Sequence, residues 1–86
     1  MNIEDEINFE VAISILNDMI GRTSLEKLAE QKKEHPDQNL VARLDARFHQ
    51  LWDERSALHY DNHVEIERVL NEYGPILKNG LPVLDA

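Results

Sequence analysis

The 86-residue sequence contains no cysteine. Disulfide bonds and zinc sites with thiolate ligands are therefore excluded, and the composition fits a reducing compartment. Glycine is scarce as well, and none of Gly21, Gly74 and Gly80 lies in a loop that could cradle a phosphate group. No serine stands in the glycine-flanked turn that exposes a hydrolase nucleophile. These absences favour a protein that is not an enzyme.

Positive charge is also in short supply. The chain has 9 lysines and arginines against 17 aspartates and glutamates, which gives a net charge of −8. Binding to nucleic acid or to an anionic membrane depends on clustered lysine and arginine, so we expect neither partner. A partner protein with a basic surface is favoured instead, because opposite charge speeds association.

Long apolar runs are missing. No stretch of 18 apolar residues is present that could span a membrane. The N-terminus carries Glu4, Asp5 and Glu6, whereas a secretory signal peptide begins with basic residues. We therefore expect a cytoplasmic protein.

The sequence does contain enough apolar material for one small core. Its hydrophobic fraction of 42% fits a globular protein, and we expect a single small helical domain over residues 1–86. A chain of this size often gains stability by self-association, so a homodimer is expected.

A stripe of apolar residues organises the stretch 40–73. On a helix of 3.6 residues per turn the stripe occupies one side, while charged residues such as Arg43, Asp45 and Arg47 occupy the other. This pattern predicts one long amphipathic helix over about 38–73. The stripe consists of Leu40, Val41, Leu44, Phe48, Leu51, Trp52, Leu58, Ile66, Val69, Leu70 and Tyr73.

The pattern does not decide whether 38–73 is one helix or two. Asp61 or Asn62 could begin a second helix as its N-cap, with Glu65 answering from the first turn, so that the long helix would be broken near residue 61. Gly74-Pro75 is expected to end this helical region. Residues 74–86 are then predicted to form an extended tail with a turn at Asn79-Gly80.

The apolar residues of the stretch 9–20 predict a helix that packs on the stripe. Gly21 is a plausible end for that helix, because glycine adopts the left-handed conformation of a C-terminal cap. Apolar residues also alternate with polar ones over 7–15, as in a half-buried strand. A strand over 7–15 therefore remains an alternative.

Residues 23–26 read Thr-Ser-Leu-Glu, the form of a capping box. The motif predicts a separate short helix from there to about Glu34, with Leu25, Leu28 and Ala29 facing inward. His35-Pro36 would end this helix, and Asp37 would cap the next. The fold class expected from all these elements is all-α, a bundle of three to four helices or a helical hairpin.

His59 and His63 stand four residues apart, which on one helix places both rings on the same face. That spacing can hold a divalent metal ion, but the sequence indicates no third ligand, and Tyr60 stands where a zinc protease has glutamate. A metal-binding protein or small metal-dependent enzyme centred on His59 and His63 is therefore an alternative function. The favoured expectation includes no metal, no cofactor and no catalytic residue.

The apolar stripe is interrupted midway by four polar residues: Arg55, His59, Asn62 and His63. Polar side chains in an apolar seam can set the register and partner choice of a helix pair. A break in the helix is the competing interpretation. Trp52, beside Phe48, could anchor a contact with a second protein. The expected interface residues are Phe48, Trp52, Arg55, His59, Asn62 and His63.

The segment Glu34-His35-Pro36-Asp37 is similar to a Glu-His-Pro segment in the immunity proteins of colicin nucleases. The chain also resembles those inhibitors in size, acidity and helical content. Their Tyr-Tyr-Pro motif and the acidic stretch flanking it have no counterpart here, so the resemblance is one of physical type and assigns no family. The net charge of −8, which would steer the chain to a basic partner, favours the same kind of protein: an inhibitor of the antitoxin, immunity or anti-defence type.

The main functional hypothesis is therefore a small acidic interaction or regulatory module that forms homodimers. A structural helical accessory subunit is a further alternative to the metal protein.

Overall fold

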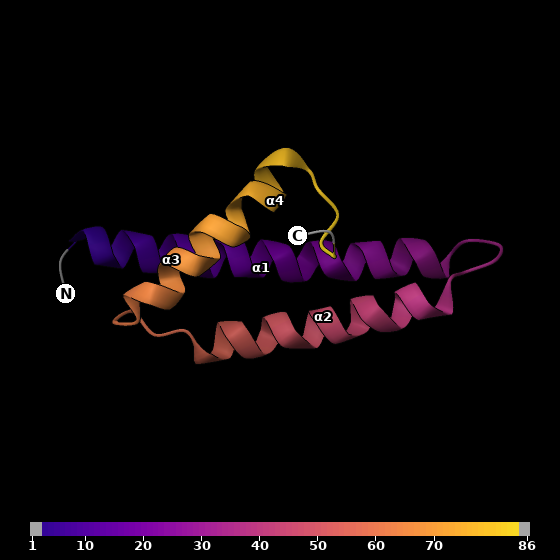
Figure 1. The fold of residues 1–86 in the computed structure, drawn as a ribbon, viewed down its shortest axis with the longest axis horizontal. Helices are drawn as coiled ribbons and strands as arrows, with labels where there is room; N and C mark the ends of the chain where they lie inside the picture. The colour runs from indigo at the N-terminus through magenta and orange to yellow at the C-terminus, as the bar shows by residue number, and fades with distance from the viewer. Residues whose placement is uncertain (1–2, 85–86) are drawn as a thin grey trace.

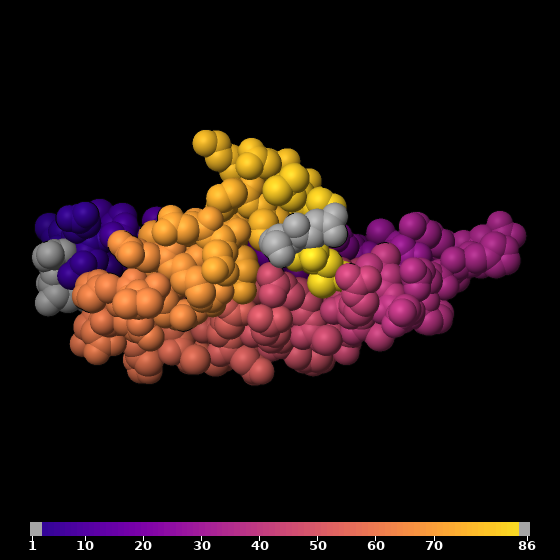
Figure 2. Space-filling model, in the orientation of Figure 1, coloured from indigo at the N-terminus to yellow at the C-terminus, as the bar shows by residue number. Residues whose placement is uncertain are grey.

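The computed structural model describes residues 3–84. Over that range the chain forms four helices and no strand: α1 (Ile3–Gln31), α2 (Gln38–Ala57), α3 (His63–Glu72) and α4 (Gly74–Asn79). The all-α prediction is confirmed. Helices α1 and α2 form an antiparallel hairpin, and α3 and α4 cross α1 beside it (Figure 1). The molecule is elongated, 51 Å along its longest axis, and narrows toward the loop between α1 and α2 (Figure 2).

Helix α1 runs without interruption through the point where two helices were predicted. Thr23 does not cap a new helix, because its hydroxyl is buried and donates to the Met19 carbonyl oxygen at 2.7 Å. Glu26 does not answer it either, since its carboxylate accepts from the backbone N–H of Val83 at 3.3 Å. The predictions of a helix end at Gly21 and of a capping box were therefore wrong, and residues 7–15 are helical.

The continuous helix also changes which residues of α1 face inward. Thr23 and Glu30 are buried on its inner face. The three residues predicted to point inward are all exposed, because the phase of α1 carries over from the preceding turns: Leu25, Leu28 and Ala29.

The loop at residues 32–37 is secured at both ends. As predicted, Asp37 caps α2, its carboxylate accepting from the backbone N–H groups of Asn39 and Leu40. Glu30 holds the loop from the other side, accepting from the Asp37 N–H at 3.0 Å and from Lys33 Nζ at 2.8 Å. These bonds lower the pKa of the Glu30 carboxyl, the Asp37 bond contributing most.

The long helix predicted over 38–73 is broken. Residues 58–62 form a short non-helical link, and Asn62 caps α3 by accepting from the Glu65 N–H at 3.2 Å. The break lies close to residue 61, where the sequence offered a restart. It allows α3 to turn away from α2 and pack against α1 (Figure 1).

The predicted extended tail begins as a helix instead. Pro75 lies in the first turn of α4, where its fixed backbone angle favours the helix and its missing N–H costs nothing. Gly80, with a φ of 64°, ends α4, and the Leu81 N–H bonds back to the Ile76 carbonyl at 2.9 Å. Val83 is then fully buried, so the segment after α4 closes the core.

One apolar core joins all four helices. It contains most of the predicted stripe, whereas Trp52 stays 41% exposed. The buried core residues are Ala12, Leu16, Met19, Ile20, Leu44, Leu51, Leu58, Ile66, Val69, Tyr73, Ile76 and Val83.

Candidate functional site

The six predicted interface residues do not form one patch along a single helix. Phe48 packs half-buried against the core, and its ring meets that of Trp52 edge-on at a centroid distance of 6.5 Å. Arg55 lies over the Trp52 ring at 5.3 Å and donates from Nε to Asn17 Oδ1 at 2.6 Å. All three predicted interface residues on α2 therefore make contacts within the chain.

The other three predicted residues lie at the break. His59 is exposed in the link after α2, Asn62 caps α3, and His63 is the first residue of α3. The two histidines thus do not share a helix face, which removes the geometric basis of the proposed metal pair. His63 Nδ1 lies 3.6 Å from Asp5 Oδ1. Within residues 3–84 no group of three or more histidines, aspartates or glutamates is placed to hold a metal ion.

A polar network links α2 to α3. Arg68 pairs with Glu54 on α2 and with Glu65 and Glu72 on its own helix. The Tyr73 hydroxyl donates to Glu54, and Arg47 and Arg68 lie over the Tyr73 ring at 5.2 and 5.3 Å. The pKa of Arg68 is raised, chiefly by its bond to Glu65, and burial raises the pKa of Tyr73. The three carboxylates of the network are paired with Arg68, whereas the buried Nε of Arg47 has no hydrogen-bond partner among the described residues.

One face of α1 carries several exposed large apolar side chains. Ile3 is 74% and Leu25 68% exposed, although both belong to the longest helix. On a helical wheel these side chains lie opposite the buried face that carries Leu16 and Thr23. We name this surface the outer face; its large apolar members are Ile3, Ile7, Val11, Leu25 and Leu28.

Charge is distributed unevenly along the molecule. Residues 3–10 and 53–68 meet at one end, where the start of α1 approaches α3 (Figure 1). They carry nine acidic side chains and two arginines, and we name them the acidic end. Residues 22–50, around the hairpin loop, carry six basic and five acidic side chains. Nearly all of the net negative charge therefore sits at one end.

A comparison of the chain with protein-family models, with curated proteins and with solved structures finds no match. In addition, no helix among residues 3–84 is long and apolar enough to cross a lipid bilayer.

Sequence reasoning missed the outer face because it divided α1 at Gly21. Once residues 3–31 are placed on one uninterrupted helix, the spacing of Ile3, Ile7, Val11, Leu25 and Leu28 reveals a second apolar stripe opposite the first. The signal was present in the sequence but required the correct helix length.

Proposed function

We propose that this chain is a small acidic interaction module without enzymatic activity, which works as an antiparallel homodimer and binds a partner protein with a basic surface. The observation that carries the proposal is the exposed apolar stripe on the outer face of α1. Apolar side chains aligned along one helix face are typical of a helix that packs on another.

The spacing of the outer face favours a second copy as its occupant. Ile7 and Leu25 lie at equal distances from position 16, and so do Val11 and Gly21. In an antiparallel pair of α1 helices whose two-fold axis passes at position 16, Ile7 of one copy therefore meets Leu25 of the other, and Val11 meets Gly21. Large apolar side chains then meet at both ends of the contact, and Ser14 faces Asp18 in the middle.

Gly21 supports the same arrangement. A glycine in a helix interior costs roughly 1 kcal/mol relative to alanine. Nothing within the chain requires it, because a Cβ added at position 21 would meet no atom within 4 Å. A bare backbone at this exposed position would instead admit the Val11 side chain of a second copy at close range. The glycine is then explained by the dimer and not by the monomer.

Charge favours the antiparallel over the parallel orientation. A parallel pair would bring the two acidic ends together, at a cost in like-charge repulsion. An antiparallel pair places each acidic end beside the hairpin-loop end of the other copy, where basic side chains are slightly in excess. The dimer would then display an acidic surface at both of its ends, and each could attract a basic partner at high rate.

Light scattering coupled to size exclusion tests the dimer directly. We expect the wild-type protein to have the mass of two chains at about 100 µM, because a high protein concentration favours self-association. The double variant Ile7→Gln/Leu25→Gln should have the mass of one chain with unchanged helical circular dichroism, because both side chains are already exposed in the monomer. Gly21→Ala should raise the dissociation constant about tenfold or more.

Trp52→Gln is the matched control, since Trp52 is an exposed apolar residue on α2 and not on the outer face. It should leave the dimer intact. A wild-type monomer at every concentration would refute the dimer, and dissociation by Trp52→Gln but not by Ile7→Gln/Leu25→Gln would move the interface to α2.

The basic partner is tested by varying the salt concentration. The rate at which the partner associates should fall steeply as ionic strength rises, and the fall should be weaker for the variant Glu4→Gln/Glu6→Gln/Glu10→Gln.

A further inference from the structure

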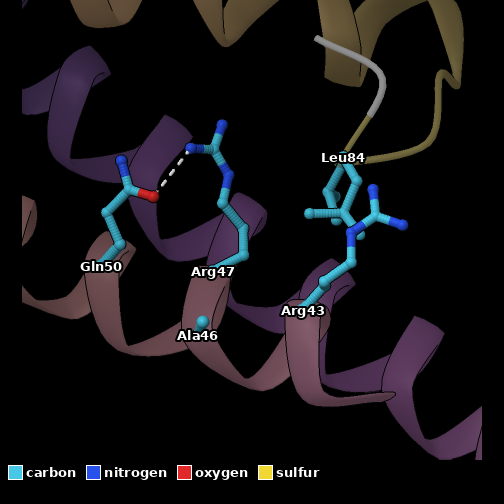
Figure 3. A pocket seen from close by; sticks show the side chains of 6 residues that line it. Arg43, Ala46, Arg47, Gln50 and Leu84 are labelled. Carbon is cyan, nitrogen blue, oxygen red and sulfur yellow. Dashed lines mark hydrogen bonds between the residues drawn. The ribbon is translucent and has the colours of Figure 1, made fainter. Parts of the chain in front are cut away.

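A groove runs between α2 and the C-terminal part of the chain. Its first section, about 340 Å³ in volume, is lined by Arg43, Ala46, Arg47, Gln50, Val83 and Leu84 (Figure 3). A second section of about 540 Å³ shares Arg47 and Gln50 with the first, so the two are adjacent. The second section continues along Arg68, Glu72, Tyr73, Pro75, Ile76 and Leu81.

The first section is basic in a protein that is otherwise strongly acidic. Arg43 and Arg47 stand one helical turn apart on α2, and Figure 3 shows both side chains rising on the side of the groove. Neither has a carboxylate within ion-pair distance among residues 3–84, although acidic residues outnumber basic ones almost two to one. Arg68, by contrast, pairs with three carboxylates, so it adds no unbalanced charge to the second section.

Arg47 is held in place but not saturated. Its Nη1 donates to Gln50 Oε1 at 3.1 Å, and its guanidinium lies over the Tyr73 ring. Its Nε is buried and has no hydrogen-bond partner among the described residues. A buried donor without a partner is uncommon in native proteins, and the forked N–H donors of a guanidinium match the two oxygens of a carboxylate.

The second section offers apolar surface beyond the arginines. Pro75 and Leu81 are exposed there, and Leu84 flanks Arg43 in the first section (Figure 3). From Arg43 to Gln50 the groove follows α2 for about 10 Å, the length of about three residues of extended chain. Glu72 at the far edge opposes a second negative charge on the occupant.

From this geometry we propose that the groove binds the C-terminal end of a partner polypeptide. The terminal carboxylate pairs with Arg43 and Arg47, and the two or three preceding residues, which are apolar and uncharged, lie along Pro75, Ile76 and Leu81. A single negative charge suits the site better than phosphate, because a doubly charged group meets both Glu72 and the net charge of −8. The site is independent of the homodimer proposed above, since the outer face of α1 does not line it.

Calorimetric titration of the full chain with acetyl-Ala-Ala-Leu-Leu tests the inference. We expect saturable one-to-one binding, weakened at least tenfold when the peptide ends in an amide instead of a carboxylate. Arg43→Gln should weaken binding by a similar factor, and this exposed side chain has no ion-pair partner to lose among residues 3–84. Arg47→Gln should do the same, with circular dichroism reporting whether loss of its contact with Tyr73 disturbs the fold.

Arg55→Gln is the matched control, because Arg55 is on α2 but outside the groove. It should bind the peptide as the wild type does. Equal affinity for the acid and the amide would overturn the proposal, as would unchanged binding by Arg43→Gln. Inorganic phosphate or octanoate binding as tightly as the peptide would also overturn it, showing a general anion site or a small-molecule site respectively.

Discussion

The Tyr73 hydroxyl donates a hydrogen bond to Glu54, 2.8 Å from one carboxylate oxygen and 2.9 Å from the other. This bond connects the junction of α3 and α4 to α2, nineteen residues earlier in the chain. Together with Arg68 and the core packing of Ile66 and Val69, it holds α3 beside the α1–α2 hairpin. The orientation in turn positions α4 along one side of the groove.

Replacing Tyr73 with phenylalanine should isolate the contribution of that hydroxyl. The ring would stay in the core and in contact with both arginines, while Glu54 would lose one donor. We expect the free energy of unfolding, measured with urea, to fall by about 1.5–3 kcal/mol, the usual range for a hydrogen bond to a charged group. Tyr60→Phe, at an exposed tyrosine, should change it by less than about 0.5 kcal/mol. Equal effects of the two substitutions would contradict the role of the network.

Asn62 is expected to act as a helix cap. Asn62→Ala removes the acceptor for the Glu65 N–H and should lower the free energy of unfolding by about 1 kcal/mol. Asn62→Asp retains an acceptor and should be close to the wild type. If Asn62 instead governed self-association, Asn62→Ala would change the molecular mass in light scattering more than it changes the urea midpoint.

Thr23 distinguishes a continuous α1 from two capped helices. In the structure its hydroxyl bonds only to the carbonyl one turn earlier, so Thr23→Val, nearly equal in shape and helix propensity, should alter the free energy of unfolding by less than about 1 kcal/mol in either direction. For an N-cap, valine would be among the worst replacements and would cost about 1–2 kcal/mol. Urea unfolding of this one variant separates the two outcomes.

Glu30 should make the protein sensitive to acid. Its folded-state pKa lies below the ordinary value of 4.5, so its ionised form contributes stability at pH values above that, and the contribution is lost as pH falls through the lowered pKa. We expect Glu30→Gln to be less stable than the wild type at pH 7, with the difference shrinking below about pH 4. A difference that stays constant from pH 7 to pH 3 would show that the carboxylate charge is not the cause.

Local signals in the sequence determined the helical class and several of the helix boundaries. The 3.6-residue spacing of apolar side chains over 40–73 predicted the helices that bury Leu44, Leu51 and Val69. Asp37 and Asn62 were recognisable as caps, because a cap depends on backbone groups only two or three residues away. The sequence indicated the helix break near residue 61. It did not show which of the six candidate interface side chains would lie together.

Tertiary structure decided the rest. Ending α1 at Gly21 would spare a glycine penalty of about 1 kcal/mol. Continuing it buries Thr23 and lets Arg22 donate to the Ile76 carbonyl and Lys27 pair with Asp45. These long-range contacts outweigh the local stop signal. Glu26 was likewise drawn to the Val83 N–H, 57 residues away. The groove beside Arg43 and Arg47 follows from such long-range contacts, which no local pattern encodes, whereas the outer face of α1 follows from the full length of the helix.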